Sequence, residues 1–158
     1  MTTTVNLKWT LKLSLNGKKL RAMEYFRRWK KFILAAQLLY STEWGDKGYV
    51  YGHLLCQWYE IILKSYLLSR NIGENFSEFN EKMRKYWHDL DKLEKEVASH
   101  KEFISFIELW DLKKLYKNHD LRYTHGAILL TWESEVVDFE LFWKFVFPII
   151  QKIEVNLN

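Results

Sequence analysis

The sequence predicts a mainly α-helical protein, an up-and-down bundle of four to five helices with a small N-terminal β element. Apolar residues recur at spacings of three and four through most of the chain, which is the period of helices with one buried face. Six glycines and one proline in 158 residues leave few places where a helix must stop. Because 48% of the residues are hydrophobic and 17% are aromatic, the chain can build one core, and we expect a single domain over residues 1–158.

The β element is expected at the N-terminus, where residues 1–17 read as a strand and a turn. Apolar and polar residues alternate strictly over residues 4–15, the period of a half-buried strand, and Asn16-Gly17 is a turn signal. A strand needs a hydrogen-bonding neighbour. We expect that neighbour to be either the short apolar segment 126–132 or the same strand of a second molecule.

The first two helices are expected at about residues 19–41 and 49–70. In the first, apolar positions step by three and four along one stripe, which contains Phe26, Trp29, Ile33, Ala36 and Tyr40. The second is apolar nearly all round, so it should be the central helix. Its exception is a polar line at spacings of four, three and four, made of His53, Gln57, Glu60 and Lys64. Glu60 and Lys64 can pair as i,i+4 neighbours. The line is either a solvated stripe or one that faces a cleft or a subunit interface.

Helical spacing resumes at residue 76 and continues, with interruptions, to the end of the chain. We expect a break near Trp87-His88, with Asp89 capping the start of the next helix. Ser99 precedes a further helix, and the last helix should run from about residue 133 to about residue 153. Pro148 lies inside that helix and should bend it or end a segment there.

Basic residues are concentrated near the N-terminus. Residues 1–31 hold nine Lys or Arg residues and one acid, whereas the remaining 127 residues hold fifteen bases and nineteen acids. Such a block can contact phosphates, or it can meet acidic residues of the same chain or of a partner subunit. The candidate phosphate or nucleic-acid surface consists of Lys18, Lys19, Arg27, Arg28 and Lys31.

Several classes of protein and site are excluded or disfavoured. The longest nearly unbroken apolar run, residues 32–40, is too short to span a bilayer, and the N-terminus has no signal-peptide pattern, so we expect a cytoplasmic protein without a membrane partner. Cys56 is the single cysteine and should be a small buried hydrophobic residue. No phosphate loop, zinc motif or nucleophile elbow occurs, and we expect no metal and no cofactor.

The polar run 117–125 contains the residues best suited to chemistry. Metal-free RNA cleavage needs groups that transfer protons and a cation that stabilises the charged intermediate. Histidine suits the first task and arginine the second. Arg122, His125 and His119 are therefore the candidate catalytic residues, and the candidate ligand-binding residues are Asn118, Tyr123, His53, Glu60 and Lys64.

Three short motifs resemble the HEPN superfamily of small helical-bundle proteins. They are Glu60-x-x-x-Lys64 on a central apolar helix, then His88-Asp89-Leu90-x-x-Leu93, then Leu121-Arg122-Tyr123 before a long final helix, and the similarity covers roughly residues 50–155. The resemblance implies a bundle of four or five helices that forms a symmetric dimer. It also implies either a metal-independent ribonuclease of a toxin–antitoxin or phage-defence system, or a module that binds RNA, nucleotides or a nucleotidyltransferase.

The chain departs from the ribonuclease pattern of that family at one point. The family's ribonucleases carry an Arg followed by four to six residues and then a His, whereas only two residues separate Arg122 from His125. The resemblance therefore predicts a HEPN-like domain and a homodimer that binds RNA, a nucleotide, a cognate antitoxin or a nucleotidyltransferase. The alternatives are a metal-independent endoribonuclease that uses Arg122 with His119 or His125, and a structural or interaction protein without a ligand.

Overall fold

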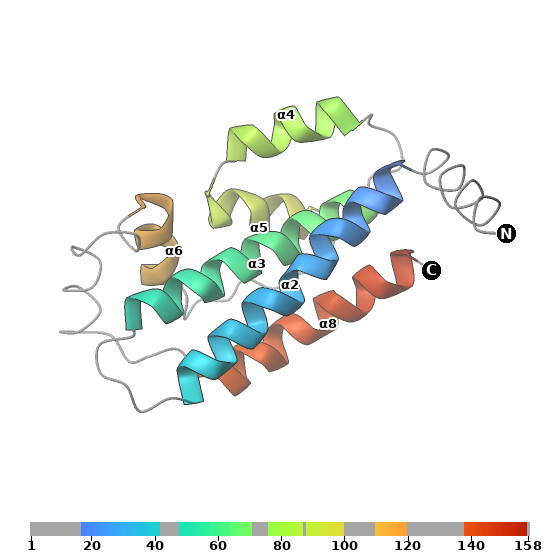
Figure 1. Ribbon diagram of the computed structural model, residues 1–158. Coiled ribbons are helices and arrows are strands. Elements are labelled where there is room, and N and C mark those ends of the chain that lie inside the picture. The colour runs from blue at the N-terminus through green and yellow to red at the C-terminus, as the bar shows by residue number, and fades with distance from the viewer. Residues whose placement is uncertain are drawn as a thin grey trace, which may run out of the picture.

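The computed structural model describes residues 17–41, 48–70, 76–86, 88–99, 110–119 and 138–157. They form the helices α2 (Gly17–Ser41), α3 (Gly48–Arg70), α4 (Phe76–Tyr86), α5 (Leu90–Ala98), α6 (Trp110–Lys117) and α8 (Phe139–Leu157). Three long helices, α2, α3 and α8, pack side by side, and α5 and α6 contact α3 while α4 lies over α5 (Figure 1). The described part of the chain is therefore a helical bundle, as the sequence predicts, but it contains six helices where four to five were expected.

Helix α3 is the centre of the bundle, which confirms its expected position. It contacts α2, α5, α6 and α8, and several of its side chains have no exposed surface: Leu55, Cys56, Trp58, Tyr59, Ile62 and Leu63. These residues lie on more than one face of the helix. Because a helix that is apolar nearly all round is stable only when covered on most sides, this sequence requires the central place.

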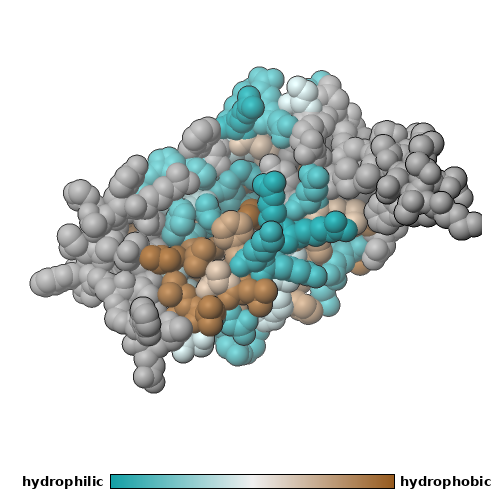
Figure 2. Space-filling model, viewed as in Figure 1, coloured by the Kyte–Doolittle hydropathy of each residue, from teal (hydrophilic) through white to brown (hydrophobic). Residues whose placement is uncertain are grey.

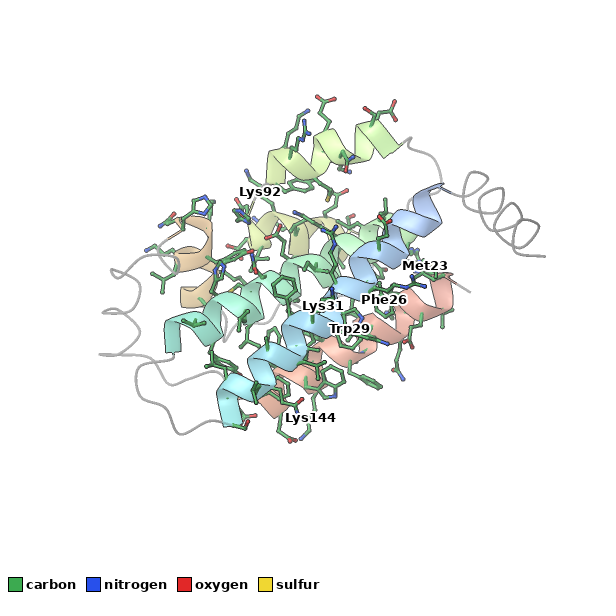
Figure 3. The ribbon with its side chains drawn as sticks, in the orientation of Figure 1. Met23, Phe26, Trp29, Lys31, Lys92 and Lys144 are labelled. Carbon is green, nitrogen blue, oxygen red and sulfur yellow. The ribbon has the colours of Figure 1, made fainter. Side chains whose placement is uncertain are left out.

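Aromatic rings fill the space between α2, α3 and α8. Trp58 of α3 lies 5.0 Å from Phe142 and 5.9 Å from Trp143, ring centre to ring centre, and Trp29 of α2 lies 6.0 Å from Trp143. Figure 3 shows Trp29 and Phe26 on the side of α2 that faces α8. The predicted stripe of α2 is buried at Trp29, Ile33 and Ala36, and it becomes exposed at Tyr40.

Helix starts follow local capping chemistry. Asp89 caps α5, where its Oδ1 accepts a hydrogen bond from the backbone N–H of Lys92 at 3.2 Å, so the predicted break and cap are confirmed. Asp138 acts in the same way for α8, accepting from the N–H of Leu141 at 2.8 Å. Pro148 does not end a segment, because α8 continues to Leu157.

Some expected elements lie outside the described residues. They include the strand 4–15, its candidate neighbour 126–132, and residues 133–137, where the last helix was expected to begin. In the described ranges there is no strand. None of the helices in these ranges is both long enough and apolar enough to cross a membrane.

Candidate functional site

A cluster of polar side chains lies between α3, α6 and the turn before α5. Its centre is Glu60, whose side chain is only 10% exposed. Lys64 forms an ion pair with Glu60 Oε1, the hydroxyl of Tyr116 donates to Oε2 at 2.6 Å, and Nδ1 of His88 lies 2.9 Å from Oε2. With His119, these residues form what we call the Glu60 cluster: Glu60, Lys64, His88, Tyr116 and His119.

The cluster depends on a tight connection between α4 and α5. The backbone N–H of Asp89 donates to the carbonyl of Tyr86 at 2.7 Å, and this turn presents His88 to α3. Lys117, in the last turn of α6, reaches Asp89 Oδ2 with its Nζ at 2.7 Å. The residue that caps α5 thus also fixes the end of α6, which carries Tyr116 and precedes His119.

Electrostatics keep Glu60 ionised. Burial by itself raises the pKa of the Glu60 carboxyl, but the charge and hydrogen bond of Lys64, with the hydrogen bonds of Tyr116 and His88, outweigh burial and leave the pKa below its usual value. An ionised carboxylate can only accept hydrogen bonds. His88 must therefore donate from Nδ1, which assigns the tautomer of the neutral ring and directs Nε2 away from Glu60.

His119 adds a second imidazole at the end of α6. Its ring meets the ring of His88 edge to face, with 5.0 Å between centres, and His88 meets Tyr116 in the same way at 5.1 Å. The backbone of His119 has φ of 62°, in the left-handed region that glycine usually occupies after a helix. A residue with a Cβ is higher in energy in this region than glycine. This backbone position aims the imidazole at His88.

A second buried network has a structural role. Nζ of Lys113 lies 2.5 Å from Glu94 Oε2, and the hydroxyl of Tyr59 donates to Glu94 Oε1 at 2.9 Å. Both charged side chains are almost fully buried, and the network joins α3, α5 and α6. Cys56 lies beside it, fully buried as expected, and burial raises the pKa of its thiol. A thiol in this setting is a poor nucleophile.

The structure brings together some of the residues that the sequence predicts for the site. Glu60 and Lys64 pair directly as expected, His53 lies 5.5 Å from Tyr116 between ring centres, and His119 meets His88, while Asn118 is exposed beside it. The interpretation of the α3 polar line as a solvated stripe is wrong for Glu60, which is buried against α6. Arg122, Tyr123 and His125 lie outside the described residues.

The candidate phosphate surface lies on another helix. Three of its residues are exposed on the N-terminal half of α2: Arg27, Arg28 and Lys31. Hydrophilic side chains gather over this N-terminal half (Figure 2; Lys31 is labelled in Figure 3). The side chains of Lys18 and Lys19 are outside the described set.

Sequence reasoning missed His88 and Tyr116 as members of the site. From the sequence, His88 is placed in a helix break and in a motif, not in the site, and Tyr116 is not singled out. A signal existed in the i,i+3 spacing of Tyr116 and His119, which placed both near one end of α6.

Neither a metal site within the described residues nor a known relative indicates which chemistry this cluster performs. The described residues contain no group of three or more His, Cys, Asp or Glu side chains that could hold a metal ion. No model of a protein family matches the chain, and neither a curated protein nor a solved structure matches it.

Proposed function

We propose that this protein is a HEPN-like RNA-binding module that receives a phosphate of its ligand at the surface of the Glu60 cluster. One observation carries the proposal: two imidazoles, His88 and His119, lie in contact at the end of α6, with the first held in orientation by a buried carboxylate. Imidazole N–H groups donate hydrogen bonds that suit phosphate oxygens.

Neighbouring groups support this proposal. Lys114, in the last turn of α6, and Asn118, directly after the helix, are exposed and supply further donors around His119. The sequence adds Arg122 and Tyr123 only a few residues later, and these types bind phosphates and stack on bases. As a HEPN-like module, the protein would act as a homodimer or with an antitoxin or nucleotidyltransferase partner, in a toxin–antitoxin or defence setting.

A binding titration tests the proposal. We expect His119→Gly combined with Lys114→Ala to weaken binding of a fluorescein-labelled single-stranded RNA about tenfold at low salt and to flatten its salt dependence. Glycine suits the backbone of residue 119, so this change removes the imidazole without straining the fold. Lys95→Ala, an exposed lysine on α5, is the control for the lost charge and should bind as wild type does.

Two outcomes would contradict the proposal: no RNA binding by the wild-type protein at low salt, or equal affinities in the site variant and the control. A triple variant, Arg27→Ala with Arg28→Ala and Lys31→Ala, measures separately whether the basic surface of α2 contributes phosphate contacts.

The arrangement of Glu60, His88 and His119 also favours a second candidate, a metal-independent endoribonuclease. One imidazole would take the proton of the 2′-hydroxyl, and the other would protonate the leaving 5′-oxygen, with formation of a 2′,3′-cyclic phosphate. Arg122 would stabilise the charge that develops on the phosphorus oxygens. An imidazole oriented by a carboxylate suits such proton transfer, because the carboxylate fixes the tautomer.

Cleavage of a labelled RNA in EDTA tests this second candidate. Wild type should cleave, whereas His119→Gly and the double variant Arg122→Ala/His125→Ala should each lose at least about 100-fold in rate. Lys95→Ala, which changes an exposed lysine on α5, is the control and should retain the activity. Intact RNA after prolonged incubation with wild-type protein would leave only the binding function.

A further inference from the structure

The exposed face of α2 divides into two chemically different halves. Exposed cations occupy its first part, at Arg27 and Lys30, and exposed leucines occupy its last part, where Leu34 is 64% and Leu38 is 68% exposed. Figure 2 shows the same division, with hydrophilic side chains over one half of this face and hydrophobic ones over the other. A contiguous exposed apolar surface of this kind is typical of an interaction site.

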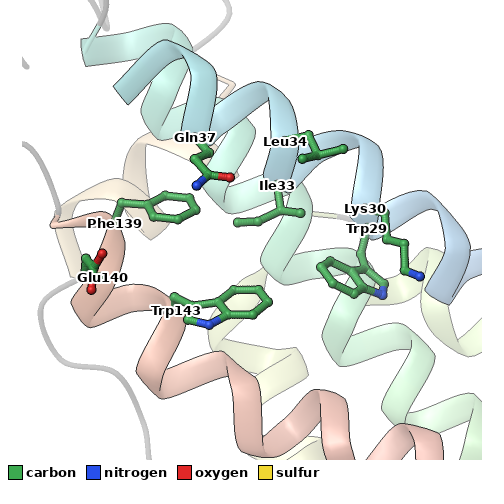
Figure 4. Close-up of a pocket in the computed structure, with 8 residues that line it drawn as sticks. All are labelled: Trp29, Lys30, Ile33, Leu34, Gln37, Phe139, Glu140 and Trp143. Atoms are coloured by element: carbon green, nitrogen blue, oxygen red, sulfur yellow. The ribbon is translucent and has the colours of Figure 1, made fainter. Parts of the chain in front are cut away.

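A pocket continues the apolar half of this face towards α8. It has a volume of about 590 Å³ and lies between α2 and α8, with walls that include Ile33, Leu34, Phe139 and Trp143 (Figure 4). Phe147, 40% exposed, stacks near Trp143 at 5.6 Å between ring centres and extends the apolar surface along α8. The pocket can therefore receive apolar side chains from a partner.

The charges at the two ends of the pocket are opposite. Lys30 lies at one end and Glu140 at the other (Figure 4). Asp138, an exposed acid that accepts a hydrogen bond from the hydroxyl of Tyr40 at 3.3 Å, adds to the acidic end beside the C-terminal end of α2. Within the described part of the chain, neither Lys30 nor Glu140 takes part in an ion pair.

This pattern is self-complementary under a two-fold rotation. Lys30 precedes Leu34 by four residues and Leu38 follows it by four, so each lies about 6 Å from Leu34 along the helix axis. If a second α2 crosses in the antiparallel direction at Leu34, its Lys30 comes level with Leu38, near Glu140 and Asp138. The same pairing occurs again on the other side of the axis, and the leucines of both copies meet between the two ion pairs.

We infer that α2 and the start of α8 form an isologous homodimer interface, with a second copy of this chain seated antiparallel on α2 about an axis near Leu34. Charge complementarity favours this occupant, because each copy supplies the acid that the other copy's cation faces. The sequence predicts a homodimer from the strand 4–15 and from the HEPN resemblance, whereas this interface rests on different residues and does not depend on the RNA-binding proposal.

Charge reversal with rescue tests the interface. Sedimentation equilibrium of the full chain should show a dimer for wild type at micromolar concentration. Lys30→Glu and Glu140→Lys should each weaken dimerisation about tenfold, since each places like charges opposite one another at two symmetric positions. An equimolar mixture of the two single variants should form a heterodimer of wild-type affinity, because both ion pairs are then restored. One pair has the wild-type residues, and in the other pair the acid and the base have exchanged positions.

The apolar part of the interface has its own test. Leu34→Asp should weaken the dimer more than 100-fold, since it places two carboxylates at the axis. Val155→Asp is the control, because Val155 is 75% exposed near the far end of α8. Lys95→Glu, on α5, is the control for Lys30→Glu.

Either of two results would overturn the inference. One is a wild-type protein that stays monomeric up to about 100 µM, because the dissociation constant would then be higher than that of a stable homodimer. The other is a dimer that Leu34→Asp and Lys30→Glu leave as stable as the two controls do. Far-ultraviolet circular dichroism of each variant checks that its helices are retained, which is expected because the changed side chains are exposed.

Discussion

At the scale of single residues, His119 combines an unfavourable backbone conformation with a ring contact to another histidine. A residue with a Cβ in the left-handed region costs about 1 kcal/mol relative to glycine. The edge-to-face contact with His88 offsets part of that cost. Strained positions of this kind are concentrated at functional sites, so His119 is the residue of the Glu60 cluster that most directly indicates a function.

This view predicts an order of stabilities for substitutions at position 119. His119→Ala keeps the backbone cost and loses the ring contact, whereas His119→Gly loses the contact but removes the cost. We expect the glycine variant to be about 1 kcal/mol more stable than the alanine variant in urea denaturation. Equal stabilities would contradict the left-handed conformation of this residue.

Some contacts of the buried charged residues could be predicted from the sequence, and others could not. The pair Glu60–Lys64 was predictable because i,i+4 neighbours always share a helix face. The buried pair Lys113–Glu94 was not, because lysine and glutamate are almost never buried unless paired, and a single sequence does not show which distant residues pair. The same limit hid the contacts of Glu60 with His88 and Tyr116, which are 28 and 56 residues away.

At the scale of elements, Asp89 joins two helices. It caps α5 through the N–H of Lys92, and it holds the end of α6 through Lys117, whose charge helps to keep the pKa of Asp89 below its usual value although burial by itself would raise it. The cap was predictable from the sequence because it spans only three residues. The link to α6 required the packing of α5 and α6 against α3.

Two substitutions separate these roles of Asp89. Asparagine is as good a cap as aspartate, so Asp89→Asn should lose only the charge attraction to Lys117 and Lys92, while Asp89→Ala should lose the cap as well and cost about 1 kcal/mol more. Urea denaturation followed by circular dichroism measures the difference. If both variants were equally stable, the cap would contribute nothing.

Helix positions were predictable for the same reason that caps were, since both depend on local periodicity. The stripes of α2 and the central place of α3 follow from apolar spacing, and the structure confirms them. The behaviour of Pro148 was not predictable, because a proline inside a helix pattern can either stop the helix or be accommodated. Here α8 continues past it on a row of buried residues that includes Val146, Ile149, Ile150 and Ile153.

At the scale of the whole molecule, the two carboxyl groups with lowered pKa values connect stability to pH. Glu60 and Asp89 both have pKa values in the folded protein below their ordinary values of 4.5 and 3.8. Their contribution to stability is therefore fully present above those ordinary values, and it is lost as the pH falls through the folded values.

We expect the urea midpoint to fall as the pH drops from about 5 to about 2, and to fall less steeply in Glu60→Gln than in wild type. Glu81→Gln is the control, because Glu81 pairs with Lys85 at the surface, where both side chains are 74% exposed. A Glu60→Gln variant with the same pH dependence as wild type and control would show that Glu60 is not held ionised by its neighbours.

The indole rings of Trp29, Trp58 and Trp143 lie within 6.3 Å of one another, centre to centre, across three helices. Transition dipoles this close couple, so the protein should carry an intrinsic optical signature in the near-ultraviolet whose shape depends on how α2, α3 and α8 sit together. Two of the three rings also line the pocket between α2 and α8. Their fluorescence can therefore report the binding of another surface over that pocket without any attached dye.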